Sequence, residues 1–300
     1  MAMKHFTRKI LKAMSFQNVK VTASRKIADL KKIDFCKRFY RKQDYLVYRD
    51  GTPIAVRVFY PEQSEKHPGI FLFFHGGGWT TDSIDTYQRI CARLSNATNQ
   101  VVVSVDYRLA PEYKFPTGLL DCYQVTKRVY QHVNEDKITL IGDSAGGNIA
   151  AAISLMAKEK QEFTVQKQVL IYPAVSGNYT DPSLFPSMEE NGFDYVLTMG
   201  KLQDYATFYA SSEEDKQNPY FAPLVAKDVS KQPATLLITA EFDPLRDEAE
   251  AYGTRLKDAG NTVEMHRIKD AIHGFFALGI KHYHVQECFD LINAFIQKKS

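Results

Sequence analysis

The sequence lacks long hydrophobic runs and has few cysteines. Apolar stretches such as residues 70–74 are far shorter than the roughly 18 residues that a membrane-spanning helix requires. The cysteines are scattered, with no C-x-x-C pair and no histidine-rich neighbourhood: Cys36, Cys91, Cys122 and Cys288. This pattern argues against a zinc site and against a disulfide framework, so we expect reduced thiols in the core.

A secretory signal, an internal repeat and a low-complexity tract are also missing. Lys4, Arg8, Lys9 and Lys12 interrupt the apolar residues near the N-terminus, and no small-residue cleavage site follows them. With 44% hydrophobic, 24% charged and 12% aromatic residues, the 300-residue chain has the composition of a globular protein. The sequence therefore predicts a globular protein of the cytoplasm.

Positive charge is concentrated at one end of the chain. Residues 1–43 contain 13 Lys and Arg against two acidic residues, whereas the whole chain has a net charge of only +3. Apolar residues of this basic segment fall on one helical face: Met3, Phe6, Ile10, Leu11 and Met14. Such a face either binds an anionic membrane surface or packs on its own domain, and we favour packing. No nucleic-acid-binding module follows, so we expect no nucleic-acid partner.

Short apolar segments alternate with amphipathic ones after residue 43. The strand-like segments are residues 45–48, 54–60, 70–74, 101–105, 138–141, 169–172, 235–239 and 262–268. The helical ones are residues 86–94, 119–133, 148–158, 246–256 and 285–296. Asp50-Gly51 predicts a turn between the first two strands, which form an antiparallel pair. The remaining alternation predicts an α/β fold with a mostly parallel eight-stranded sheet flanked by helices on both faces.

Two segments do not follow this alternation. They are residues 1–43 and a stretch of about residues 176–220 that contains several prolines and glycines. We interpret the first as an N-terminal cap segment and the second as a cap insertion. The remainder, residues 44–300 apart from the insertion, is predicted to be one catalytic domain.

A candidate nucleophile lies in the sequence Gly-Asp-Ser-Ala-Gly at residues 142–146. This pattern follows a predicted strand directly and precedes a predicted helix, as a nucleophile elbow does. Gly142 and Gly146 have no Cβ atoms to collide in the strained turn that would expose the Ser144 hydroxyl. The helix that begins there favours developing negative charge near its N-terminus.

A glycine-rich loop follows another predicted strand. In His75-Gly76-Gly77-Gly78-Trp79, backbone N–H groups can approach a substrate oxygen closely, as in an oxyanion hole. Gly76, Gly77 and Gly78 are therefore candidates, together with the N–H of Ala145. The alternative is a phosphate-binding loop, but no Lys or Thr follows the glycines as in a P-loop.

A serine hydroxyl needs a base to accept its proton and return it to the leaving group. His273 stands out because it precedes a glycine in a loop just after the last predicted strand. The third member should be a carboxylate at a strand end between the serine and the histidine in chain order. Asp243 has this position, and Pro244 biases it away from helical geometry. The competing acids are Glu241, Asp247 and Glu248, of which the last two can complement a helix dipole.

Five motifs together resemble a known family. HGGGW, VDYRLAPEYKFP, GDSAGGN, EFDPLRDEAEAYG and IHGF are similar to the serine hydrolases of the hormone-sensitive lipase type, within the α/β-hydrolase superfamily. The resemblance runs from about residue 45 to the C-terminus. It implies an α/β-hydrolase fold with a mostly helical cap, no metal and no organic cofactor, and Gly77 and Gly78 as oxyanion donors. It also implies that Asp106, Arg108 and Glu112 support the site structurally.

The resemblance predicts a serine carboxylesterase that hydrolyses small esters with short to medium acyl chains through an acyl-enzyme intermediate. Two alternatives keep the same triad: an amidase and a carbohydrate acetyl esterase. A third is a ligand-binding protein on this scaffold, like the plant gibberellin receptors, which lack the catalytic histidine. Retention of His273 favours an enzyme. Both a monomer and a homodimer are compatible with the sequence.

Overall fold

The sheet of the computed structural model has eight strands, as predicted. The structure describes residues 15, 18–32, 40–63, 68–277 and 283–298. The strands are β1 (Lys42–Arg49), β2 (Thr52–Phe59), β3 (Ile70–Phe74), β4 (Val101–Asp106), β5 (Ile138–Asp143), β6 (Lys167–Ile171), β7 (Ala234–Phe242) and β8 (Val263–Ile272). They are ordered β1-β2-β4-β3-β5-β6-β7-β8, and only the β1/β2 and β2/β4 pairs are antiparallel. The prediction of a mostly parallel α/β sheet is confirmed.

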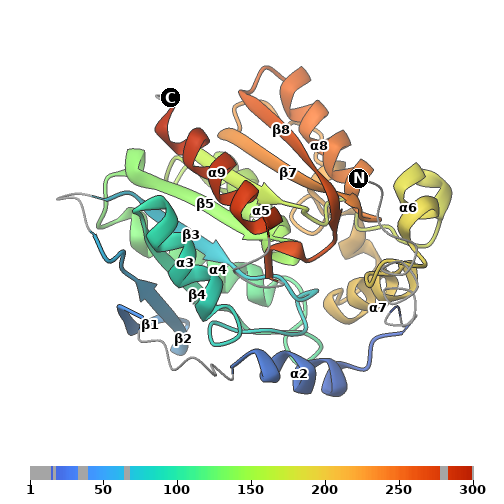
Figure 1. The fold of residues 1–300 in the computed structure, drawn as a ribbon, viewed down its shortest axis with the longest axis horizontal. Helices are drawn as coiled ribbons and strands as arrows, with labels where there is room; N and C mark the ends of the chain where they lie inside the picture. The colour runs from blue at the N-terminus through green and yellow to red at the C-terminus, as the bar shows by residue number, and fades with distance from the viewer. Residues whose placement is uncertain (1–14, 16–17, 33–39, 64–67, 278–282, 299–300) are drawn as a thin grey trace.

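Helices cover both faces of this sheet (Figure 1). The five predicted helices are present as α3 (Gln88–Thr98), α4 (Thr117–Tyr130), α5 (Ala145–Lys160), α8 (Arg246–Asp258) and α9 (Tyr283–Gln297). Alternate residues of a strand point to opposite faces. Leu72 and Phe74 of β3 accordingly pack in the cluster that contains residues of α4, α5 and α8, whereas Phe71 and Phe73 pack in the cluster with α3 and α9.

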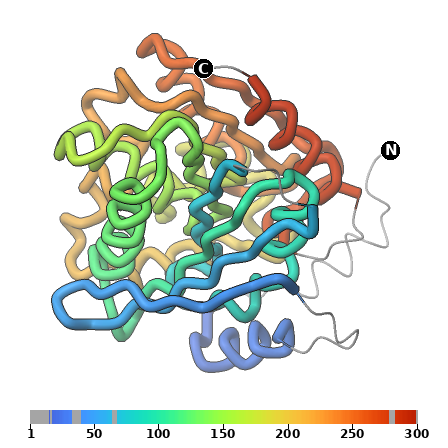
Figure 2. Tube along the Cα trace, turned by 90° about the vertical axis from the view of Figure 1, so that its left-hand side faces the viewer, coloured from blue at the N-terminus to red at the C-terminus, as the bar shows by residue number. Residues whose placement is uncertain are grey.

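Further helices lie in the segments predicted to form a cap. They are α2 (Val21–Asp29), α6 (Pro186–Asn191) and α7 (Met199–Tyr209), together with the short 3-10 turns η1 (Leu30–Lys32), η3 (Pro182–Leu184) and η4 (Glu213–Gln217). Three more 3-10 turns lie outside these segments: η2 (Glu135–Lys137), η5 (Pro223–Val225) and η6 (Phe275–Ala277). Figure 2 shows the β1–β2 hairpin with α2 below it. The predicted helical face between Met3 and Met14 lies outside the described residues.

The cysteines that the structure describes are reduced. Cys91, Cys122 and Cys288 are buried and free, as the sequence predicts, while Cys36 lies outside the described residues. Burial in apolar surroundings raises the pKa of each of these thiols, which keeps them protonated. None of the helices in the described part of the chain combines the length and the apolar character needed to cross a membrane.

Candidate active site

Ser144 occupies a strained turn between β5 and α5. Its backbone has φ 54° and ψ −119°, a conformation that residues other than glycine rarely adopt. The turn is possible because its neighbours are glycines: a Cβ on Gly142 would overlap the backbone of Gly146, and a Cβ on Gly146 would overlap the Phe74 carbonyl. The local sequence therefore projects the serine away from the sheet, as a nucleophile elbow does.

The structure brings Ser144, His273 and Asp243 together. His273 Nε2 lies 2.9 Å from Ser144 Oγ, and His273 Nδ1 lies 2.7 Å from Asp243 Oδ2. Asp243 is fully buried, and its other oxygen accepts the N–H of Leu245 at 2.8 Å. An imidazole held by its Nδ1–H on a fixed carboxylate presents Nε2 as the proton acceptor for the serine hydroxyl.

Parallel strands place these residues at the same edge of the sheet. Ser144 follows β5, Asp243 follows β7 and His273 follows β8. The last strand, β8, is longer than predicted and continues to Ile272, the residue before His273. Its pairing with β7 shifts register between Ala240 and Phe242 of β7. The ring of Tyr172, directly after β6, lies beside the imidazole with ring centroids 4.7 Å apart.

The competing acids have other partners. Glu241 accepts the N–H of Asp270 at 2.7 Å, and Asp247 pairs with Arg246. Glu248 is buried, and its carboxylate accepts hydrogen bonds from the N–H groups of Val175 and Ser176. Asp247 and Glu248 do lie in the first turn of α8. Glu248 thereby ties that turn to the segment between β6 and α6, and Asp247 ties it to α6 by accepting the N–H of Ser187 at 2.8 Å. The sequence does not reveal these roles.

Gly77 and Gly78 adopt left-handed backbone conformations beside Ser144, with φ of 103° and 58°. The Gly77 carbonyl accepts hydrogen bonds from the N–H groups of Thr80 and Thr81, at 3.1 and 3.0 Å. Because the peptide group is planar and trans, this fixes the Gly78 N–H in the opposite direction. Both glycines and Ala145 line the cavity that contains Ser144.

Gly76 is placed differently from the prediction. Its N–H donates a hydrogen bond to Asp143 Oδ1 at 3.0 Å, so it is engaged inside the protein. We therefore leave Gly76 out of the proposed oxyanion hole and retain Gly77, Gly78 and Ala145. The direction of the Gly76 N–H depends on a carboxylate 67 positions away, which no local motif indicates.

Asp143 is a buried carboxylate that sequence reasoning did not single out. Besides the Gly76 N–H, it accepts hydrogen bonds from the hydroxyls of Tyr87 at 2.9 Å and Tyr172 at 3.3 Å. Burial raises the pKa of Asp143 to about 6. Its position inside the elbow motif was the available signal, whereas the two tyrosines have no distinctive sequence context.

A cavity of about 270 Å³ contains the proposed nucleophile and base. Its walls combine the strand-end residues with side chains of the predicted cap segments. The latter include Lys31, Val196, Leu197, Lys201, Leu202 and Tyr205. Asp106, Arg108 and Glu112 do not line this cavity; Arg108 pairs with Asp121, and Glu112 pairs with Arg25 of α2. Within the described residues, no group of three or more His, Cys, Asp and Glu could hold a metal ion.

Comparison with known proteins identifies the family. A family model described as alpha/beta hydrolase fold matches residues 71–277, more than half of the chain. The chain therefore belongs to this family, in agreement with the resemblance to hormone-sensitive lipase-type hydrolases. The arylesterase of Saccharolobus solfataricus is 37% identical over 239 residues, which cover 78% of this chain and 76% of that protein.

Other relatives agree in both sequence and structure. Esterase LipI of Mycobacterium tuberculosis is 35% identical over 244 residues, covering 78% of this chain and 75% of that protein. An esterase of Pyrobaculum calidifontis superimposes with a TM-score of 0.88 at 36% identity, covering 98% of both chains. The fold thus matches that of a solved esterase along almost its whole length.

Proposed function

We propose that this protein is a serine carboxylesterase. One observation carries the proposal: a continuous hydrogen-bond chain joins Ser144, His273 and Asp243 inside a cavity. The activities named for its relatives, arylesterase and esterase, support carboxylester hydrolysis.

The geometry supports an acyl-enzyme mechanism. Ser144 Oγ attacks the ester carbonyl carbon while His273 Nε2 accepts the serine proton. Asp243 holds the imidazole in the correct tautomer and stabilises its positive charge. The N–H groups of Gly77, Gly78 and Ala145 bind the oxyanion, and His273 then returns the proton to the leaving alcohol. Water, activated by the same histidine, hydrolyses the acyl-enzyme.

The same site supports the proposed domain organisation. Residues 44–300 supply the triad and the proposed oxyanion hole, whereas residues 1–43 and about 176–220 form the cap. Two contacts support a joint cap: the Val19 N–H donates to Asp204 Oδ2 of α7 at 2.6 Å, and the Val196 N–H donates to Ser15 Oγ at 2.8 Å.

The size of the cavity supports small substrates. Its volume of about 270 Å³ lies just below the usual range for small-molecule sites, roughly 300–1,000 Å³. Apolar side chains such as Leu202 and Val196 suit an acyl chain of short to medium length. We propose a cytoplasmic enzyme, monomeric or homodimeric, that acts without nucleic acid or a cofactor.

Hydrolysis of p-nitrophenyl esters from acetate to long acyl chains tests this function. Ser144→Ala and His273→Ala should each lose turnover while remaining folded. Ser183→Ala and His132→Ala change an exposed residue of the same type and should retain full activity. Folded wild-type protein with no turnover of any ester would contradict the proposal and favour an amide or sugar-acetate substrate, or ligand binding without catalysis.

A further inference from the structure

Two tyrosines of α7 contact consecutive residues of the glycine loop. A Cβ on Gly78 would lie 2.5 Å from both Cγ and Cδ1 of Tyr205, so the tyrosine ring occupies the space that the missing side chain leaves. One helical turn further on, the ring of Tyr209 stacks on Trp79 with ring centroids 4.6 Å apart and planes inclined by 3°. The helix thus packs directly against the proposed oxyanion loop.

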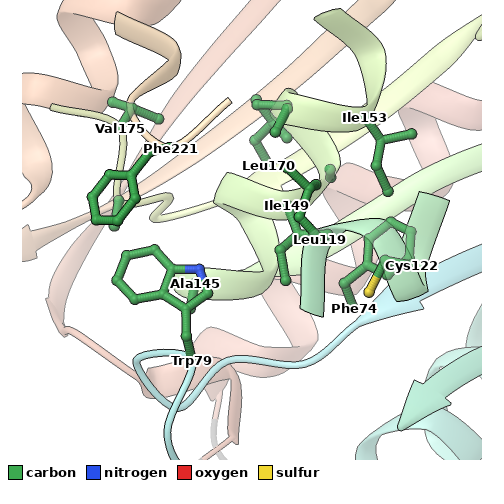
Figure 3. Packing of buried hydrophobic residues seen from close by; sticks show 14 of the residues in the cluster. Phe74, Trp79, Leu119, Cys122, Ala145, Ile149, Ile153, Leu170, Val175 and Phe221 are labelled. Atoms are coloured by element: carbon green, nitrogen blue, oxygen red, sulfur yellow. The ribbon is translucent and has the colours of Figure 1, made fainter. Parts of the chain in front are cut away.

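The two tyrosines differ in what else they touch. Tyr209 is fully buried among aromatic rings, and Phe221 lies 5.1 Å from it between centroids. Figure 3 shows Phe221 and Trp79 within this core, close to Ala145. Tyr205, in contrast, is half-buried and lines the cavity that contains Ser144. Tyr205 is therefore the member of the pair that a bound substrate meets.

Neighbouring contacts hold Tyr205 in place. On the preceding residue, Asp204 Oδ2 accepts the N–H of Val19, and Gln203 Nε2 donates to the Tyr179 carbonyl at 2.7 Å. These bonds attach α7 to the N-terminal segment and to the segment after β6. Movement of α7 away from the cavity would require breaking them, so the helix that carries Tyr205 is fixed, and the ring itself is packed against Gly78.

The proposed chemistry indicates which part of an ester meets this ring. His273 must donate a proton to the leaving oxygen, so the alcohol group lies on the side of His273. The carbonyl oxygen faces the N–H groups of the glycine loop. The acyl chain takes the remaining direction, and the apolar surfaces that line the cavity, among them Leu202 and the ring of Tyr205, suit such a chain.

We infer that Tyr205 determines acyl-chain specificity, because its ring, fixed against Gly78, closes the acyl side of the cavity. This inference rests on the proposed esterase function. Replacement of the ring by a small side chain extends the cavity, whereas loss of the hydroxyl alone leaves the wall intact. A longer acyl chain therefore gains access only when the ring itself is removed.

The test measures kcat/KM for p-nitrophenyl butyrate and p-nitrophenyl octanoate. In Tyr205→Ala, and to a smaller degree in Tyr205→Leu, the octanoate-to-butyrate ratio should rise by at least about tenfold, since even one methylene changes discrimination by ~10- to 200-fold. Tyr205→Phe should keep the wild-type ratio, and so should the matched control Tyr209→Phe. Because both substrates are measured on one variant, a uniform loss of activity cancels in the ratio.

Ethyl and hexyl acetate provide the corresponding series for the alcohol group. An unchanged acyl ratio in folded Tyr205→Ala and Tyr205→Leu, or a change confined to the alcohol series, would overturn the inference. The proposed function would still stand in that case, because it fails only if the wild type hydrolyses no ester.

Discussion

The two halves of the cavity are built in different ways. The sheet half consists of Ser144, Asp243, His273 and the glycine loop, each placed directly after a strand whose ladder fixes its position. The half formed by α2 and α7 depends on contacts between distant segments, such as Val19 with Asp204, 185 positions apart. In our proposals, the chemistry belongs to the sheet, whereas substrate selection belongs to the helices over it.

The largest expected effect is on the sheet half. Asp243→Asn should lower kcat by about 10³- to 10⁴-fold, because the amide no longer holds the imidazole in the required tautomer. Steady-state kinetics with p-nitrophenyl butyrate measures the loss. Glu241→Gln is the matched control, since Glu241 bonds to the Asp270 backbone rather than to His273. Equal losses in both variants would contradict the assignment of Asp243.

A second variant addresses the proposed oxyanion hole. Gly77→Ala should reduce kcat by about 10²- to 10³-fold, the effect of losing one oxyanion donor, with a smaller change in KM. The added methyl group would collide with Thr81 Oγ1, which lies 2.8 Å from the ideal Cβ position, and the φ of 103° disfavours alanine. A variant that kept wild-type kcat would exclude Gly77 from the oxyanion hole.

Glu248 joins the first turn of α8 to the segment after β6. Burial raises its pKa to about 7, above the ordinary value of 4.5, so the folded protein retains a proton that the unfolded chain loses. Stability should therefore decrease as the pH rises from about 4.5 to 7. Glu248→Gln should flatten this part of the pH profile of Tm, measured by calorimetry. Glu213→Gln, at an exposed position, should leave the profile unchanged.

If Glu248→Gln retained the full wild-type slope, Glu248 would not be the group responsible. Asp143, whose pKa is also raised, would then be the next carboxyl to examine.

The smallest expected effect concerns the attachment of α2. Arg25 pairs with Glu112 at 2.7 Å and donates to the Thr80 carbonyl at 2.8 Å, but both side chains of the pair are partly exposed. Arg25→Met should lower Tm by only about 2–4 °C, which corresponds to ~1 kcal/mol in a protein of this size. Lys26→Met, on the exposed side of the same helix, should not change Tm. If Arg25→Met lost catalytic activity without any change in Tm, the chemistry would depend on α2, which would contradict its assignment to the sheet half alone.

The sequence predicts the sheet half well because its signals are local. Strand, turn and helix follow one another around Ser144, and Asp243 and His273 each stand immediately after a strand. Gly76 shows where local reasoning ends, because the direction of its N–H depends on Asp143, far away in sequence. The contact between Tyr205 and Gly78 is equally long-range, so Tyr205, which borders the cavity, has no sequence signature.

The most direct test of the central claim is covalent labelling with a serine-reactive p-nitrophenyl phosphonate, followed by mass spectrometry of the intact protein and its peptides. The account predicts one adduct per chain, on Ser144, with loss of esterase activity in proportion to labelling. Ser144→Ala should remain unlabelled, and Ser183→Ala should be labelled like the wild type. An adduct on another residue, or full activity of a protein labelled at Ser144, would contradict the account.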